Sequence, residues 1–444
     1  MRNALTISMN ICFIFLTGHT FSQNENSVSL DQQGKKEIID RVSASLIKSY
    51  VYGDTARLMK ARLESRFSDG GYNNISNAPD FADTLTADLR GIYFDHHLSV
   101  HYAPDLFAHL IHSKQGSAEQ ANKEFQGAKH ANFGFRKMEI YKGNIGYVAL
   151  DQFYPVNKSS AKTVSSVFRF LSNTNAVIID LRNNIGGEPE MVKRICSYLF
   201  ESKTHINDLY ERRTKKTIFY VTEPLAESEL FKDKPFYILT SSGTFSAGEE
   251  FAYDLQVLKR AVIVGETTGG GAHPVSPIAI SKGFVAFVPY ARAINPITKT
   301  NWEGIGIIPD IKISSANALD EALLKIYEHL AMTSQDKNEK AAIVWQRNLL
   351  SSRLEPVNPD TAMLKAYTGS FEDVLVTFEN RELYFATKSG HKSKLIPLTQ
   401  TTMKRLDGDE DDIQIEFLKD ANNIVNKICV HFSDGGEEHL KKTL

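Results

Sequence analysis

Residues 240–256 read TSSGTFSAGEEFAYDLQ, and this stretch decides the fold. An apolar strand over residues 236–240 runs into a turn of small residues and then into a helix, which places Ser246 at the helix start. Free backbone N–H groups at that end favour negative charge, as a serine nucleophile requires. Serine is also a common N-cap, so a purely structural role stays open. The G-x-S-x-G elbow is absent, because Thr244 occupies its first glycine position.

Strands and helices alternate on both sides of this stretch. NAVIIDLR (175–182), KPFYILTSS (234–242) and RAVIVGETT (260–268) are β-rich runs, and PEMVKRICSYLFES (189–202) and residues 247–260 separate them as helices. Such alternation predicts crossover βαβ units and a mostly parallel sheet, so the fold class is α/β.

Two glycine-rich loops follow the predicted strands. DLRNNIGGEPEM (180–191) contains Gly186 and Gly187, and VGETTGGGAHP (264–274) contains three consecutive glycines. Glycine lets a backbone approach a ligand closely, although a plain strand-to-helix turn explains the first loop equally well. Neither the P-loop pattern nor G-x-G-x-x-G spacing is present, which argues against a nucleotide cofactor.

The flanking segments predict two further parts. Residues 38–93 carry apolar residues at three- and four-residue spacing, which predicts a bundle of helices. Short strands with turn signals follow Pro359 and predict a small antiparallel β-domain. We therefore expect a helical domain over 23–110, an α/β core over 111–335 and a β-domain over 356–444.

Composition narrows the class of protein. Of 444 residues, 42% are hydrophobic and 23% are charged, as in a soluble globular protein. The net charge of −2 argues against a dedicated nucleic-acid binder. Three cysteines are too few for a disulfide scaffold, although Cys196 and Cys429 leave one bridge open.

Residues 1–22 have the features of a secretory signal peptide. Arg2 is followed by a largely apolar run from Ala4 to Thr17 and then by small and polar residues. We expect cleavage near Ser22 and a periplasmic or secreted protein. An N-terminal membrane anchor is the alternative, although a spanning helix needs about 20 apolar residues.

Three motifs in fixed order carry a family resemblance. D-L-R-x-N-x-G-G (180–187), S-x-x-T-F-S-A-x-E (241–249) and G-E-x-T-x-G-G (265–271) resemble the tail-specific, or C-terminal processing, serine peptidases. That superfamily includes the tricorn core and the interphotoreceptor retinoid-binding protein modules. The resemblance covers roughly residues 30–330 and implies a crotonase/ClpP-like spiral in the core.

The resemblance points to the tricorn-like branch, which uses a histidine base. The lysine of the PDZ-containing branch would fall at Gly271, and too few residues separate Pro104 from Phe133 for a PDZ domain. Asp95-His96-His97-Leu98 matches a D-x-H-L segment and implies His97 as the base. The tricorn pattern has serine where this chain has His96, so a relay to the acid is altered and His96 stays an alternative base.

The implied function is a serine peptidase that acts on polypeptides through an acyl-enzyme. Ser246 is the nucleophile, His97 the base, and Glu303 in EGIGIIPD the acid that orients the site. The oxyanion hole is expected from the amide of Gly186 or Gly187 together with that of Ala247. Gly270, Gly271 and His273 are candidate substrate-binding residues, and a satisfied loop residue or a catalytic group stays open as the role of His273.

We expect no cofactor and no metal, because the histidines lack metal-binding spacing. A homo-oligomer is compatible with the sequence. The rival hypothesis is a non-catalytic protein that binds a hydrophobic ligand or a peptide on the same scaffold.

Overall fold

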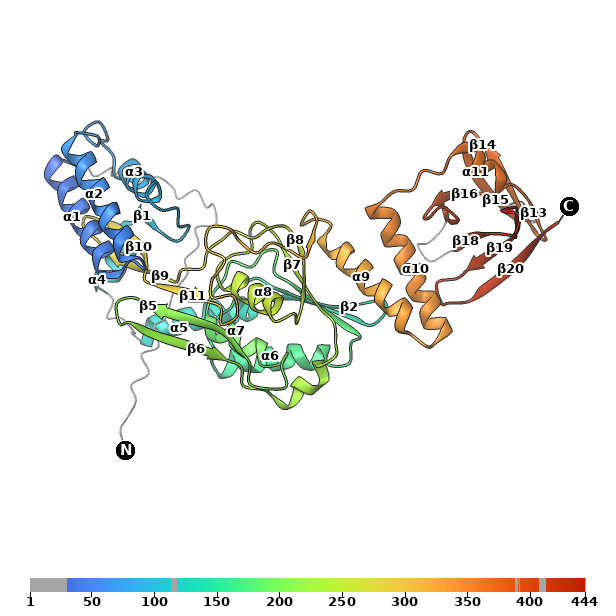
Figure 1. Ribbon diagram of the computed structural model, residues 1–444, viewed down its shortest axis with the longest axis horizontal. Coiled ribbons are helices and arrows are strands. Elements are labelled where there is room, and N and C mark those ends of the chain that lie inside the picture. The colour runs from blue at the N-terminus through green and yellow to red at the C-terminus, as the bar shows by residue number, and fades with distance from the viewer. Residues whose placement is uncertain (1–29, 113–117, 388–389, 391, 407–412, 444) are drawn as a thin grey trace. The chain divides into compact units, whose positions relative to one another are not determined.

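A six-stranded sheet forms the centre of the fold in a computed structural model of the chain. Its strand order is β12-β8-β7-β4-β3-β2 (Figure 1). The pairs β4–β7, β7–β8 and β8–β12 are parallel, which confirms the predicted α/β class. The strands are β2 (Phe135–Tyr141), β3 (Ile145–Leu150), β4 (Ala176–Asp180), β7 (Phe236–Thr240), β8 (Val262–Gly265) and β12 (Ile311–Lys312).

Three helices contribute to the core around this sheet. Every residue of β4 is buried, as expected for a parallel strand covered on both faces. Buried apolar side chains of the sheet and the helices form one cluster that includes Phe168, Val192 and Phe251. The helices are α6 (Lys158–Leu171), α7 (Pro189–Cys196) and α8 (Ala247–Val257).

Helices near the N-terminus pack on a second, three-stranded sheet of order β1-β10-β9 (Figure 1). The run 283–293 divides at Tyr290: its first half pairs with β1, and its second half, β11, pairs with β5. The elements are α1 (Gln32–Ser49), α2 (Gly53–Ser68), α3 (Ala78–Arg90), β1 (Ser99–Tyr102), β9 (Val275–Ala279) and β10 (Phe284–Pro289).

A third sheet, of order β11-β5-β6, completes this part of the chain. Its strands are β5 (His205–Glu211), β6 (Lys216–Val221) and β11 (Ala291–Ile294). The connecting helices are α4 (Pro104–His112), α5 (Ala118–His130), η1 (Asn132–Gly134) and η2 (Ala226–Phe231).

The C-terminal part forms a closed antiparallel barrel of eight consecutive strands, with its own buried core. In a closed barrel the first and last strands pair with each other, whereas an open antiparallel sheet leaves the outer edges of those two strands exposed. The strands are β13 (Gly369–Phe371), β14 (Val374–Glu379), β15 (Glu382–Thr387), β16 (Lys392–Pro397), β17 (Thr402–Leu406), β18 (Gln414–Lys419), β19 (Val425–His431) and β20 (Glu437–Thr443). Three helices precede them: α9 (Ala318–Thr333), α10 (Lys337–Leu354) and α11 (Thr361–Ala366).

The structure describes residues 30–112, 118–387, 390, 392–406 and 413–443. These described residues divide into two compact units: those within 1–139, 147–173 and 177–312 form the first, and those within 140–146, 174–176 and 313–444 form the second. Residues 313–335 were predicted to belong to the core, but they group with the second unit because α9 packs on α10. The predicted signal peptide and its alternative, an anchor, lie outside the described residues.

Two further observations concern the described residues. Cys196 and Cys429 are both buried free thiols, so the bridge that the sequence left open does not form. None of the described helices combines the length and the apolar character that crossing a membrane requires.

Candidate active site

Ser246 occupies the corner between β7 and α8. Its backbone lies in the left-handed region, at φ 54° and ψ −121°, which is strained for a residue with a side chain. The turn is held because the Thr244 hydroxyl donates to the Leu181 carbonyl at 2.7 Å. Such strain clusters at functional sites, and here it accompanies a half-buried hydroxyl-bearing residue.

The Gly186–Gly187 loop lies directly against this corner. A Cβ on Gly186 would sit 2.6 Å from the Ser246 Cβ, and one on Gly187 would sit 2.1 Å from the Phe153 carbonyl oxygen. Both glycines also have positive φ angles, of 102° and 136°. Only glycine therefore brings this backbone so close to Ser246.

The three predicted oxyanion-hole amides are not equivalent. The Gly186 amide donates to the Asn184 Oδ1 at 2.9 Å, so this donor is engaged inside the protein in this conformation. Within the described part of the chain, the amides of Gly187 and Ala247 donate no hydrogen bond. These two remain candidates for holding an oxyanion.

Glu249 joins the corner to the triple-glycine loop, a role that sequence analysis missed. Its carboxylate accepts the amides of Ser246 at 2.9 Å, Gly270 at 2.6 Å and Gly271 at 2.8 Å. It also accepts the Thr268 hydroxyl at 2.5 Å. Burial raises the pKa of Glu249 to about 7, although these four donors oppose the rise. The Ser-x-x-Glu spacing of a capping box was the available signal.

The backbone of the triple-glycine loop is engaged within the protein. The amides of Gly270 and Gly271 go to Glu249, and their carbonyls accept the Gly304 amide and the Trp302 indole N–H. In this conformation the amides of Gly270 and Gly271 are thus occupied by Glu249.

His97 is fully buried beside this loop. Its ring lies 4.7 Å, centroid to centroid, from that of Phe245, and its Cε1 lies 2.6 Å from where a Cβ on Gly271 would be. Burial lowers the pKa of His97 to about 4, against the attraction of Asp95. The imidazole is therefore neutral near pH 7, as a general base must be. The alternative base, His96, is exposed.

Asp95 organises the segment that carries His97. Its Oδ1 accepts the His97 amide at 2.9 Å, while its Oδ2 lies 2.8 Å from the His273 Nδ1 and 3.3 Å from the Tyr50 hydroxyl. Asp95 was quoted in the D-x-H-L motif without a role, and only the folded chain reveals its partners.

His273 lies beside both Asp95 and Glu303. His273 is wholly buried and held by Asp95, so it does not line a substrate cleft. Glu303 accepts the Ala272 amide at 2.6 Å and lies 3.4 Å from the His273 Nδ1, so these contacts orient His273 rather than His97. Burial, and then the charge of Asp95, raise the pKa of Glu303 to about 8.

Two groups of described residues bring metal-ligand atoms within 4.8 Å of one another. Asp95, His273 and Glu303 form the first, but the 2.8 Å hydrogen bond between Asp95 and His273 leaves no space between those atoms for an ion. Cys429, Glu437 and His439 of the second unit form the other group.

A strained serine at a strand-to-helix corner, with two unengaged amides and a buried neutral imidazole beside the triple-glycine loop, is an arrangement of the kind that serine hydrolases use. Residues 144–313 match the family model of peptidase family S41, and residues 25–127 match that of the N-terminal domain of Peptidase_S41 in eukaryotic IRBP. The chain thus carries a peptidase family S41 domain behind an S41 N-terminal domain, which confirms the family resemblance.

Curated relatives match part of the chain. Carboxyl-terminal-processing peptidase 2, chloroplastic, of Arabidopsis thaliana is 30% identical over 188 residues, which cover 40% of this chain and 33% of the relative. A carboxyl-terminal-processing protease of Synechocystis sp. is 30% identical over 169 residues, covering 38% and 37%. The chain therefore spans about a third of the length of these relatives.

Among solved structures, the photosystem II D1 C-terminal processing protease is similar at a TM-score of 0.42 and 15% identity. The match covers 63% of this chain and 93% of that one.

Proposed function

We propose that this protein is a serine peptidase in which Ser246 is the nucleophile and His97 the general base. The observation that carries the proposal is the Glu249 network, because one buried carboxylate holds the amide of Ser246 and the amide of Gly271, beside which His97 lies. The nucleophile and the base thereby belong to one rigid arrangement, as acyl transfer requires.

In the proposed reaction, neutral His97 accepts the proton of the Ser246 hydroxyl while the oxygen attacks a peptide carbonyl. The amides of Gly187 and Ala247 hold the oxyanion of the tetrahedral intermediate. Imidazolium then protonates the leaving amine, and an acyl-enzyme remains. Water, deprotonated by the same imidazole, hydrolyses the acyl-enzyme and frees the serine.

The geometry at Gly271 supports a histidine base over a lysine base. A Cβ at this position would lie 2.3 Å from the Phe245 ring and 2.6 Å from the His97 ring. A lysine here and the observed imidazole therefore exclude one another, and the imidazole occupies the space.

The proposed substrates are polypeptides cleaved near a free carboxyl terminus. The relatives are named carboxyl-terminal-processing peptidases, which supports this class of substrate. Paired fluorogenic peptides that differ only in a free or an amidated C-terminus test it. We expect faster cleavage of the free acid, and equal rates would contradict the preference.

The test of the nucleophile compares Ser246→Ala with Ser242→Ala, an exposed serine of the same turn. We expect Ser246→Ala to reduce casein hydrolysis on the order of 10⁴- to 10⁶-fold and to abolish fluorophosphonate labelling, while Ser242→Ala keeps both. Retained hydrolysis or labelling in Ser246→Ala would refute the assignment. Fatty-acid or retinoid binding without serine-dependent hydrolysis would favour the ligand-binding alternative.

We further propose that residues 1–22 direct export to the periplasm or beyond and are removed. A positively charged residue followed by an apolar run supports export. N-terminal sequencing of the protein from a bacterial expression host tests it, since a mature N-terminus near Gln23 is expected. An intact Met1 in the cytoplasmic fraction would contradict export.

A further inference from the structure

Five side chains of metal-binding type gather on the outer face of the barrel. Ile428 and Val430 belong to the barrel core, so the residues that alternate with them on β19 face outward. Strand register pairs Cys429 with His439 and with Glu416, and His431 with Glu437. The barrel-face cluster is therefore Glu416, Cys429, His431, Glu437 and His439.

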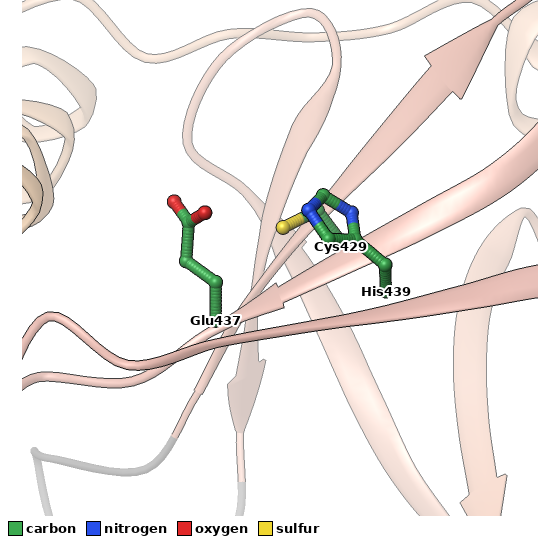
Figure 2. Close-up of side chains that lie close together, drawn as sticks. All are labelled: Cys429, Glu437 and His439. Carbon is green, nitrogen blue, oxygen red and sulfur yellow. The ribbon is translucent and has the colours of Figure 1, made fainter.

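Three members of this cluster stand close enough to share one ion. The Cys429 Sγ, a Glu437 carboxylate oxygen and a His439 ring nitrogen all lie within 4.8 Å of one another. Figure 2 shows the His439 ring beside the Cys429 sulfur, with the Glu437 carboxylate on the same side of the strands. Cysteine, histidine and carboxylate together are the ligand set of zinc.

We propose that Cys429, Glu437 and His439 bind one Zn²⁺ ion on the outer face of the barrel. The inference is independent of the peptidase function. A tetrahedral ion needs its ligands at about 2.0–2.3 Å, and rotation of the exposed Glu437 and His439 side chains closes the remaining distance without moving the strands.

His431 supports the ligand carboxylate from outside. Its Nδ1 lies 3.1 Å from a Glu437 oxygen, and its Nε2 lies 3.2 Å from Glu416. Because a carboxylate has two oxygens, Glu437 can keep this hydrogen bond with one and bind zinc with the other. Hydrogen-bonded ligand carboxylates of this kind are typical of metal sites.

The surroundings protect the thiol and leave room for a fourth ligand. Cys429 is 2% exposed, whereas Glu437 and His439 are open to solvent, so the ion enters from their side. Glu437 and His431 also border a cleft of about 640 Å³ between α10 and the barrel. Water would supply the fourth ligand from the solvent side of Glu437 and His439.

Zinc ligation changes the state of the thiol. When the Zn–S bond forms, the S–H bond breaks and the proton passes to solvent.

The test is a Zn²⁺ titration of the metal-free, full-length protein against a chromophoric chelator, followed by Co²⁺ substitution. We expect one equivalent of Zn²⁺ and a thiolate-to-Co²⁺ charge-transfer band that disappears in Cys429→Ser. His439→Ala and Glu437→Gln should each weaken Zn²⁺ binding at least about 10-fold, and His431→Ala should do so by roughly 10- to 100-fold.

Two matched controls separate this site from nonspecific binding. Glu438→Gln alters the neighbouring residue, which pairs with Val430 on the other face of β20, and Cys196→Ala removes the other free thiol among the described residues. Both should bind like the parent. If circular dichroism shows that Cys429→Ser does not fold, the variants of the exposed residues His439 and Glu437 decide whether this cluster binds Zn²⁺. Unchanged stoichiometric binding in those two, or no thiolate band in the parent, would overturn the proposal.

Discussion

The Ser246 site and the barrel-face cluster are assembled in opposite ways. The first brings together segments around residues 97, 186, 246 and 271, and buried carboxylates hold it through backbone amides. The second arises from the register of three neighbouring strands, and two of its three proposed ligands are exposed. Substitutions in the first should therefore change activity and stability together, whereas those in the second should affect ion binding alone.

The largest effect in this comparison should come from the two adjacent histidines. We expect His97→Ala to lower kcat/KM for casein by roughly 10²- to 10⁴-fold, because the proton acceptor is removed. His96→Ala changes an exposed ring and should retain most activity. Addition of imidazole should partly restore the His97 variant. The reverse pattern would assign the base to His96.

Gly271→Ala should disturb the same site through packing. The new methyl group would meet the Phe245 and His97 rings at 2.3 and 2.6 Å, and such overpacking costs about 1–3 kcal/mol. Gly127→Ala is the matched control, because it lies within α5 with nothing within 4 Å and should stabilise by about 0.5–1 kcal/mol. Urea unfolding measures both. If Gly271→Ala left the free energy of unfolding unchanged, the loop would accommodate the methyl group without strain.

The pH dependence of Ser246 labelling should report the burial of His97. Only the neutral imidazole accepts a proton, and its pKa is about 4 in the folded protein. The labelling rate should stay level as pH falls through 6.5 and then drop about tenfold per pH unit below 4. Because the pKa of Glu249, which holds the Ser246 amide, is about 7, a decline near 6.5 would contradict a buried base only if it persists in Glu249→Gln.

Unfolding must be separated from this titration. The pKa of His97 in the folded protein is below its unfolded value of about 6.5, so the unfolded state takes up the proton first as pH falls. The free energy of unfolding therefore decreases between pH 6.5 and 4. Samples held at each pH and returned to neutral before labelling provide the control, since full recovery excludes irreversible unfolding.

The smallest effect should come from the barrel-face cluster without metal. Glu437→Gln and Glu438→Gln both alter exposed residues, so each should change the free energy of unfolding by no more than about 0.5 kcal/mol. With saturating Zn²⁺, the parent and Glu438→Gln should gain stability, but Glu437→Gln should gain less. Thermal unfolding with and without Zn²⁺ measures this, and equal gains in all three would remove Glu437 from the site.

Much of the S41 site could be predicted because local patterns carry it. The corner at Ser246 follows from an apolar strand, small turn residues and a helix start, and the glycines at 186 and 187 mark a close backbone approach. Glu249 was also accessible through its capping-box spacing. Hydrogen-bond partners could not be predicted in this way: the Gly186 amide is engaged by Asn184 and His273 by Asp95.

The amino-acid sequence by itself determined the α/β class, the strand-to-helix corner and the family, because periodicity, glycines and ordered motifs act over short distances. Only the tertiary structure decided that Asp95 holds both His97 and His273, and that Cys429 faces His439. Burial and strand register bring together groups that no local pattern relates, and a buried polar group takes whichever partner the fold places within reach.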